Sequence, residues 1–415
     1  MKWTEGIDKI GLGLYFLLCI FAIANIYSVD EGLGKKQLLF FGVSIFIGII
    51  IFFSRSKFFE NMSGIIYIGG VLMLAGLHVF GTEILGQKNW YKFGSFTMQP
   101  VEFSKIGVAL MLANYVSGAE FNLNNKKSLI TALGIIAIPA VVVLSIPDVG
   151  SLLVFTAFFI ALYREGLSGQ LFFIGTLFAS VFLIANYLND PLGWSLWYFT
   201  VFIIFIGLLW FLFNAAFLRK NIYNLLPGVA VILGLAALSF ISPIIFEKLP
   251  KHQQERVEVL YKGEKEFRDT SGYNLLYSKT AIGSGGLTGK GYREGSVTQG
   301  KFVPEQETDY IFCTVGEEWG FLGSTILVLF YLIYIGRIYY LSEQQKSVFN
   351  RVFGYCFASI LFMHFSINLG MVMGLFPTVG IPLPYFSYGG SSLLAFSILT
   401  FIFFKLNYAD KNSLV

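Results

Sequence analysis

The sequence predicts an all-α polytopic membrane protein with about twelve transmembrane helices. Composition is the first reason: of 415 residues, 55% are hydrophobic and only 13% are charged, and the mean hydropathy is +0.69. Soluble domains carry roughly 25% charged residues. The second reason is that long apolar stretches recur along the chain, and one helical span needs about 20 apolar residues. These observations exclude a water-soluble enzyme and give no support to nucleic-acid binding.

The apolar stretches define the expected spans in order. The first is too long for the apolar part of a signal peptide and lacks a cleavage site, so we interpret it as a helix that is retained. Two stretches give the weakest signal, because one contains Glu102 and Lys105 and the other is short. The predicted helices cover residues 11–28, 37–53, 62–80, 102–118, 128–146, 149–163, 170–188, 193–214, 225–246, 310–336, 350–374 and 384–404.

The distribution of Lys and Arg predicts which side of the membrane each loop and terminus occupies. If the N-terminus is cytoplasmic, fourteen Lys and Arg residues fall in the inside loops and tails, against four in the short outside loops. This asymmetry follows the positive-inside rule. We therefore expect both termini to be cytoplasmic and the one long connection, residues 247–308, to be a large extracytoplasmic loop.

A glycine-rich segment within this loop is a candidate ligand contact. Loops of about 60 residues without a span are unusual and are often functional. Residues 281–291 read AIGSGGLTGKG, and such a backbone can turn sharply and approach a ligand closely. Ser284 and Thr288 stand where a P-loop or a GxGxxG pattern requires glycine, which argues against a nucleotide site. The amides could still cradle an anion, although the local sequence favours a plain turn.

The chain changes from acidic to apolar at residues 304–321, PEQETDYIFCTVGEEWGF. Asp309 lies at this junction, at the expected outer membrane face, and its spacing alone favours helix N-capping. Glu317 and Glu318 follow about two turns deeper on the same helix. Carboxylates at that depth are costly, so we expect both to face the bundle interior or a wet cavity.

Further polar residues fall on the same outer side. Trp90 could lie in the aromatic belt at the membrane interface. Glu102 and Lys105 share a helix face, and their simplest interpretation is a local ion pair. Asp148 follows Pro147 between two predicted spans, where a tight turn at the membrane edge is expected.

The C-terminal region predicts an irregular segment inside the membrane. Residues 352–404 contain no charged residue, yet Pro377, Pro382 and Pro384 interrupt the apolar pattern. Irregular backbone at membrane depth must be buried in protein or line a cavity, so a short re-entrant loop explains the pattern. His364 is interpreted as a packing residue with satisfied hydrogen bonds rather than a ligand. No metal-ligand cluster is evident in the sequence.

Taken together, these blocks resemble the SEDS family of membrane-embedded peptidoglycan polymerases and shape, elongation and division proteins. The glycine-rich block is more similar to the elongation branch (RodA) than to the division and sporulation branches (FtsW, SpoVE). The resemblance covers most of the chain. It rests on Trp90 with Gln99-Pro100 and residues 102–105, PDVGS at 147–151, GYNLLYSKTAIGSGGLTGKG at 272–291, PEQETDYIF at 304–312 with GEEWGF after it, and NLGMVMGLFPTVGIPLPYFSYGGSS at 368–392.

The resemblance implies a fold, an activity and a location. The fold is a SEDS-type helical bundle in a single membrane domain, 1–415, whose family core has ten spans; the two surplus spans suggest an inserted helical hairpin at 166–220. The activity is that of a peptidoglycan glycosyltransferase that polymerises lipid II, the undecaprenyl-diphosphate-linked disaccharide-pentapeptide, during cell elongation. The location is the bacterial cytoplasmic membrane with an extracytoplasmic active site. The implied partner is a class B penicillin-binding protein, a transpeptidase.

The resemblance also assigns roles to residues. Asp309 matches the family's essential acidic residue, and an attacking sugar hydroxyl needs such a base or a carboxylate-held cation. The leaving diphosphate needs cationic or backbone N–H partners. The candidates for this role, in order of preference, are Lys105, Lys279, Lys290 and the glycine turn. The substrate-binding candidates are Lys105, Glu102, Trp90, Lys279, Lys290, Gly285, Gly286, Glu307 and Asp148.

Two departures from the family pattern affect these expectations. Where the family commonly has His-Thr-Asp, this chain has Glu307-Thr308-Asp309, so Asp309 and Glu307 are the ligands we expect if a divalent cation such as Mg²⁺ or Mn²⁺ is used. Ahead of Trp90 the family often carries Arg, whereas this chain has Asn89.

Two other functions compete with the enzyme. A flippase for lipid II is the main alternative, but transporters tend to place binding groups at the bilayer midplane within paired repeats. Here the ionisable groups gather at the outer edge, which favours chemistry over transport. If the chain were only a scaffold that recruits a partner, the interfacial carboxylates would have no function.

Overall fold

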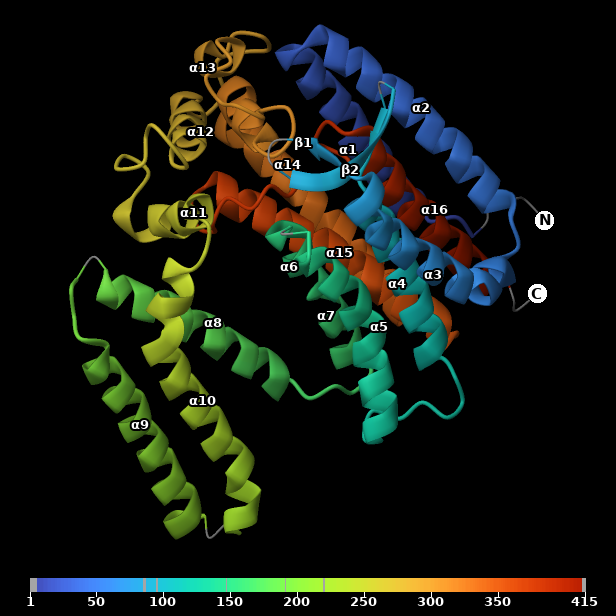
Figure 1. The fold of residues 1–415 in the computed structure, drawn as a ribbon. Coiled ribbons are helices and arrows are strands. Elements are labelled where there is room, and N and C mark those ends of the chain that lie inside the picture. Colours follow the sequence, from blue (N-terminus) through green and yellow to red (C-terminus); the bar gives the residue numbers. More distant parts are fainter. Residues whose placement is uncertain are drawn as a thin grey trace. The chain divides into compact units, whose positions relative to one another are not determined.

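The protein is a multi-pass helical membrane protein, as the sequence predicted (Figure 1). Within the described residues, ten helices are long and apolar enough to cross a membrane. The two weakest predicted spans also form helices, a 17-residue helix and a pair of short helices in series. The computed structural model describes residues 6–84, 87–94, 96–146, 148–190, 192–218 and 221–412.

The elements follow one another along the chain in three groups. The first part contains α1 (Lys9–Val29), α2 (Glu31–Phe53), α3 (Ser56–Phe80), β1 (Thr82–Ile84), β2 (Gln87–Phe93), β3 (Phe96–Met98), α4 (Pro100–Val116), α5 (Lys126–Leu144), α6 (Val149–Phe155) and α7 (Ala157–Arg164). The middle contains α8 (Gln170–Asn189), α9 (Leu196–Leu212), the π-helix η1 (Phe213–Phe217), α10 (Ile222–Glu247) and α11 (Lys251–Lys262). The last part contains α12 (Tyr273–Ser284), α13 (Ser296–Gln299), α14 (Ile311–Glu343), α15 (Val348–Val372) and α16 (Gly390–Asn412).

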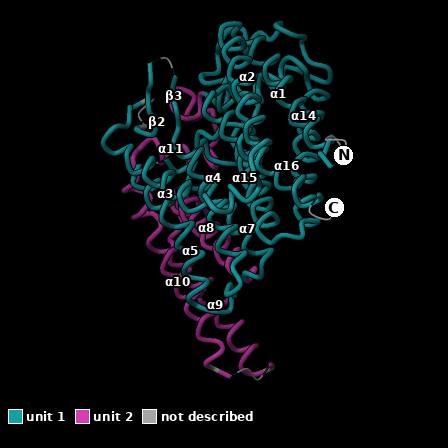
Figure 2. Tube along the Cα trace, turned by 90° about the vertical axis from the view of Figure 1, so that its right-hand side faces the viewer, with its two compact units in different colours: residues 1–167, 274–415 teal, residues 168–273 magenta. Residues whose placement is uncertain are grey.

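The chain divides into two compact units (Figure 2). Unit 1 combines Met1–Leu167 with Asn274–Val415, and unit 2 is Ser168–Tyr273. Within unit 2, α10 packs against both α8 and α9. The inserted hairpin expected at 166–220 corresponds to α8 and α9, apart from residues 191, 219 and 220, which lie outside the described ranges. That these helices are an insertion stays a prediction.

The core of unit 1 forms around α15 and α16, which are buried along most of their length. A helix that is apolar on all sides is expected at such a position. α4 packs against α3, α5, α15 and α16, and glycines allow its closest approach to α3. A Cβ at Gly107 would lie 2.9 Å from Tyr67 Cα, and one at Gly70 would lie 3.0 Å from Ser104 Cα. Small residues at helix crossings are typical of membrane bundles.

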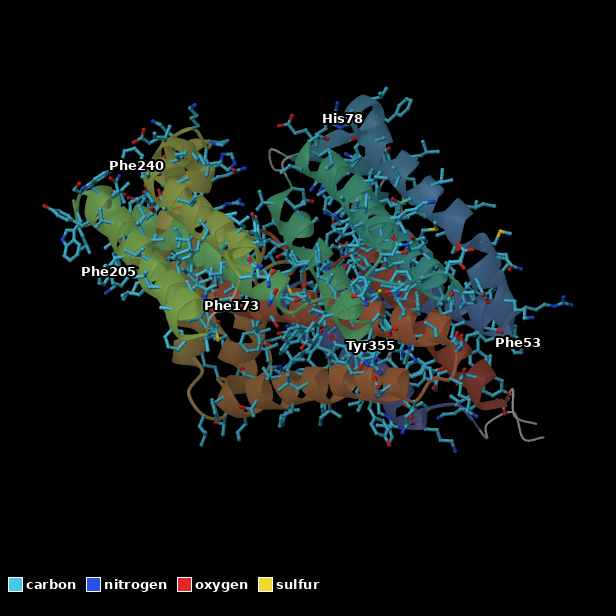
Figure 3. All side chains as sticks on the ribbon, turned by 90° about the horizontal axis from the view of Figure 1, so that it is seen from below. Phe53, His78, Phe173, Phe205, Phe240 and Tyr355 are labelled. Atoms are coloured by element: carbon cyan, nitrogen blue, oxygen red, sulfur yellow. The ribbon has the colours of Figure 1, made fainter. Side chains whose placement is uncertain are left out.

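Large apolar side chains cover the outside of the spanning helices. Phe53 on α2 and, in unit 2, Phe173, Phe205 and Phe240 are each more than half exposed, and Figure 3 labels these residues. In water such residues would form an unfavourable apolar surface. They are explained by contact with lipid tails, in agreement with the membrane interpretation.

Two connections are more ordered than the sequence analysis expected. The connection between α3 and α4 forms a three-stranded antiparallel sheet in the order β1-β2-β3, with Trp90 of β2 paired to Thr82. The long connection at 247–308 contains α11, α12 and α13. The alternation of side chains along QKNWYKF fits a short strand, but the surrounding apolar helices dominate the sequence signal.

Candidate active site around Asp309

Asp309 lies in the segment between α13 and α14, one residue before the helix cap. The N-cap residue of α14 is Tyr310, so Asp309 does not occupy the capping position that its spacing favoured. Its side chain is half-buried and lies beside Gly380, where an added Cβ would be 3.2 Å from Asp309 Oδ2. Gly380 has a φ of +70°, which favours glycine at this position. An added Cβ at this distance would press on the carboxylate, so glycine lets the loop approach Asp309 closely.

The backbone around Asp309 is fixed by three consecutive hydrogen bonds. The carbonyls of residues 307–309 each accept one bond from the C-terminal part of the chain. The donors are Tyr388 N–H at 2.8 Å, Ser387 Oγ at 2.6 Å and Asn368 Nδ2 at 2.8 Å. These three bonds anchor a segment that has no helical or sheet bonds of its own, and so they hold the Asp309 backbone in position.

Two of these donors, Ser387 and Tyr388, belong to the proline-containing loop that joins α15 to α16, and Asn368 lies on α15 itself. Residues 373–389 are non-helical, as Pro377, Pro382 and Pro384 predicted. Within the loop, the turn at residues 379–382 is contacted from three sides. A Cβ at Gly150 of α6 would lie 2.5 Å from Val379 O, and Asn368 Nδ2 donates to Ile381 O at 2.7 Å. Asp309 and the start of α6 therefore meet at one turn.

Lys279 reaches the opposite end of the same loop. It lies on α12 and is exposed, and its Nζ would be 3.7 Å from a Cβ added at Gly374. The preceding Ser278 anchors α12 by donating to Val372 O at 3.3 Å. The structure thus places the Lys279 ammonium near Gly374 and the Asp309 carboxylate near Gly380, two glycines of one loop.

Asp148 links α6 to the strand that carries Trp90. Its Oδ1 accepts from Ser151 N at 2.9 Å, which caps α6, and its Oδ2 accepts from Asn89 Nδ2 at 3.2 Å. Asn89 stands where the family resemblance expected Arg, and here its amide is bonded to a buried carboxylate. Trp90 itself is half-buried. Pro147, part of the same motif, lies outside the described residues.

Glu102 and Lys105 form the local ion pair that their spacing predicted, but they form it in the interior. Lys105 Nζ lies 2.8 Å from Glu102 Oε1, with side chains 1% and 2% exposed. Lys105 Nζ also lies 2.6 Å from His364 Nε2, across 259 residues of sequence. Sequence reasoning treated His364 as a packing residue and missed this contact. No local sequence signal indicates this contact, because Lys105 lies on α4 and His364 on α15.

Lys290 compensates a different buried carboxylate. Its Nζ lies 2.6 Å from Oε1 of Glu317, whose side chain is fully buried. The same carboxylate accepts backbone N–H bonds from Val297 at 2.9 Å and Thr298 at 2.8 Å. Glu318 is also buried, so the expectation that both glutamates face the interior is confirmed.

The glycine-rich segment packs its backbone onto a kink in α14. The helix breaks at Gly320, which has φ 63° and ψ −160°. Across the kink, the N–H groups of residues 290 and 291 donate to the carbonyls of residues 317 and 318, at 3.0 and 3.1 Å. In the reverse direction, the N–H groups of residues 321 and 322 donate to the carbonyls of residues 286 and 287. A Cβ at Gly285 would lie 1.9 Å from Gly316 O, so glycine is required for this approach.

Glu307 lines a pocket of about 180 Å³ beside the junction of α1 and α2. Burial raises the pKa of Glu307, and the Glu305 and Asp30 carboxylates add to this effect while Lys301 opposes it. No group of three or more His, Cys, Asp or Glu residues that could hold a metal occurs among the described residues. The lining residues are Val29, Asp30, Leu33, Lys301, Val303, Pro304, Glu305, Gln306 and Glu307.

Comparison with known proteins gives a family match along nearly the whole chain. The family model described as cell cycle protein, FtsW/RodA/SpoVE, matches residues 7–192 and 198–412. Among curated relatives, the chain is similar to peptidoglycan glycosyltransferase MrdB of Escherichia coli (strain K12). The two are 29% identical over 397 residues, which cover 93% of this chain and 91% of MrdB.

Solved structures are similar in fold. A chain from a peptidoglycan synthase complex superposes with a TM-score of 0.73 at 22% identity, covering 99% of this chain and 100% of that chain. Rod shape determining protein RodA of Thermus thermophilus superposes with a TM-score of 0.64 at 21% identity, covering 99% of each chain. The similarity extends through α8 and α9 as well as through unit 1.

Proposed function

The chain belongs to the FtsW/RodA/SpoVE family of cell cycle proteins, and we propose that this peptidoglycan glycosyltransferase polymerises lipid II into glycan strands during cell elongation. The activity agrees with that named for MrdB. The observation that carries the residue-level proposal is the Asp309 carboxylate, placed beside Gly380 on a backbone held by three hydrogen bonds. A carboxylate on a backbone fixed in this way is suited to act on a bound sugar.

In the proposed reaction, Asp309 is the general base. A hydroxyl of the acceptor sugar attacks the anomeric carbon of the donor, and its proton passes to the Asp309 carboxylate. The new glycosidic C–O bond forms as the C–O bond to the diphosphate breaks, and the electron pair leaves with the prenyl diphosphate. The increasing negative charge on the diphosphate requires a cationic partner.

We assign direct contact with the diphosphate to Lys279 before Lys105. Lys279 is exposed beside the loop that also contacts Asp309, whereas the Lys105 side chain is only 1% exposed. Lys105 and Glu102 would then act from inside the bundle, by fixing the position of the groups that do meet substrate. If a divalent cation takes part, Asp309 and Glu307 are the carboxylates that would hold it. Such an ion would neutralise charge on the leaving diphosphate.

The proposal also includes a location for the chain and a partner protein. The chain would lie in the bacterial cytoplasmic membrane with both termini in the cytoplasm and Asp309 on the extracytoplasmic side. A class B penicillin-binding protein would cross-link the strands that this chain makes. The fold similarity to a chain of a peptidoglycan synthase complex supports this assignment.

The test is Asp309→Asn, assayed with purified protein and lipid II. A general base contributes about 10²- to 10⁴-fold to rate, so we expect polymerisation to fall by at least 100-fold without a change in melting temperature. Asp269→Asn is the matched control, because Asp269 has a side chain that is 86% exposed in unit 2. Full polymerisation by the Asp309 variant would contradict the proposal and would lead us to test lipid II transport in vesicles.

A further inference from the structure

His364 is a buried side chain to which the proposed reaction gives no role, although it contacts both Lys105 and the proline-containing loop. It occupies the same face of α15 as Asn368, one helical turn away. The two side chains bind consecutive carbonyls of the 379–382 turn: His364 Nδ1 lies 3.1 Å from Pro382 O, and Asn368 Nδ2 lies 2.7 Å from Ile381 O. Asn368 also binds Asp309 O at 2.8 Å. This face of α15 therefore sets the position of the turn relative to Asp309.

The partners of His364 determine its protonation. A carbonyl oxygen can only accept, so Nδ1 must carry the hydrogen that is donated to Pro382 O. Lys105 is an ammonium donor beside Glu102, so His364 Nε2 accepts from it over 2.6 Å. The imidazole is then neutral, with one ring nitrogen donating and the other accepting. It joins α4, through Lys105, to the loop that contacts Asp309.

We propose that His364 is a positioning residue, which couples the buried Glu102–Lys105 pair to the 379–382 turn and so aligns the turn with Asp309. The inference rests on the proposed polymerase function. His364 is 2% exposed and need not touch substrate. Its removal would leave an ammonium hydrogen and a carbonyl without partners in a low-dielectric interior, and the turn would lose its connection to α4.

Three substitutions separate the two hydrogen bonds. His364→Phe keeps a ring in edge-on contact with Phe396, now 5.0 Å between centroids, and removes both bonds. His364→Gln can place an amide oxygen near the Nε2 position to accept from Lys105. His364→Asn can place an amide nitrogen near the Nδ1 position to donate to Pro382 O. The three variants are compared in the full chain, reconstituted with lipid II.

We expect His364→Phe to lower kcat by at least tenfold with KM changed by less than twofold, and the Gln and Asn variants to keep several-fold more activity than Phe. Combined with Lys105→Met, His364→Phe should cause no further loss beyond about threefold, since linked residues are not additive. Equal kcat values for all three variants, or losses that multiply with Lys105→Met, would show that the ring only fills space and would overturn the proposal.

A readout independent of activity distinguishes this inference from the proposed function. The chain has three histidines, so a ¹⁵N-histidine spectrum of the membrane-embedded protein can be assigned by difference with His364→Phe. We expect a neutral His364 with the hydrogen on Nδ1 at pH 7, and a shift of its Nε2 signal in Lys105→Met. A hydrogen on Nε2, or no shift, would overturn the inference even if polymerisation is normal. An inactive wild-type chain with the expected spectrum would contradict the proposed function instead.

Discussion

Lys290 shows how one charged side chain can have two competing explanations. As a member of the glycine-rich block it was a candidate partner for the leaving diphosphate, yet its ammonium lies 2.6 Å from the fully buried Glu317 carboxylate. Removing one member of a buried ion pair leaves an uncompensated charge and costs about 3–5 kcal/mol. Lys290 remains 28% exposed, and Glu317 keeps its backbone donors. We therefore expect the loss of stability on removing Lys290 to be somewhat smaller than for a fully buried pair, but still large.

We predict that Lys290→Met lowers the free energy of unfolding by about 2–4 kcal/mol, measured by thermal or chemical unfolding in detergent. Lys301→Met is the control, because Lys301 is 66% exposed and lies 3.5 Å from Asp30; an exposed pair is worth about 1 kcal/mol or less. Specific activity of the folded Lys290 variant should stay within a fewfold of wild type. Unchanged stability combined with lost turnover would assign Lys290 to the diphosphate.

At the scale of elements, the glycine-rich segment and α14 form one packed unit. The segment supplies donors and acceptors for the backbone groups that the Gly320 kink leaves unpaired. Helix interruptions in a membrane protein must have their backbone groups satisfied in this way. The sequence indicated either an anion cradle or a plain turn, and the contacts give the glycines a third use, which is close backbone packing.

Two alanine substitutions test this use. Gly285→Ala would place a Cβ 1.9 Å from Gly316 O, whereas Gly283→Ala, two residues earlier, would meet nothing within 4 Å. Overpacking costs about 1–3 kcal/mol, so we expect Gly285→Ala to lower the melting temperature clearly. Gly283→Ala lies in α12 and should be neutral or stabilising by up to about 1 kcal/mol. Equal stability of the two variants would argue against the packing role.

Elements were more predictable from the sequence than the contacts between them. Each apolar stretch that was long enough to predict a span forms helix in the structure, including α4 despite its two charges. The prolines correctly indicated the non-helical loop at 373–389. Asp309 was identified through a family motif, because its spacing alone suggested a helix cap. The contact of Lys105 with His364 joins residues 259 apart in sequence. No local pattern encodes such a contact, since it depends on how α4 and α15 pack.

At the scale of the whole molecule, the orientation in the membrane is the main property left to test. An even number of crossings would place both termini on one side, and the Lys and Arg distribution of fourteen against four predicts that this side is the cytoplasm. This predicted orientation would put Asp309 and the 379–382 turn on the extracytoplasmic side, where we propose that lipid II is polymerised. The reverse orientation would expose the active site to the cytoplasm.

Cysteine labelling can decide the orientation, because the three native cysteines are buried and provide a silent background. We predict that an impermeant maleimide labels Lys92→Cys and Glu294→Cys in intact spheroplasts. Asn124→Cys and Gln344→Cys should react only after the membrane is permeabilised. All four positions are exposed, so a difference in labelling reports the side of the membrane rather than burial. The opposite pattern would contradict the extracytoplasmic active site, and with it the assignment of Asp309 to glycan polymerisation.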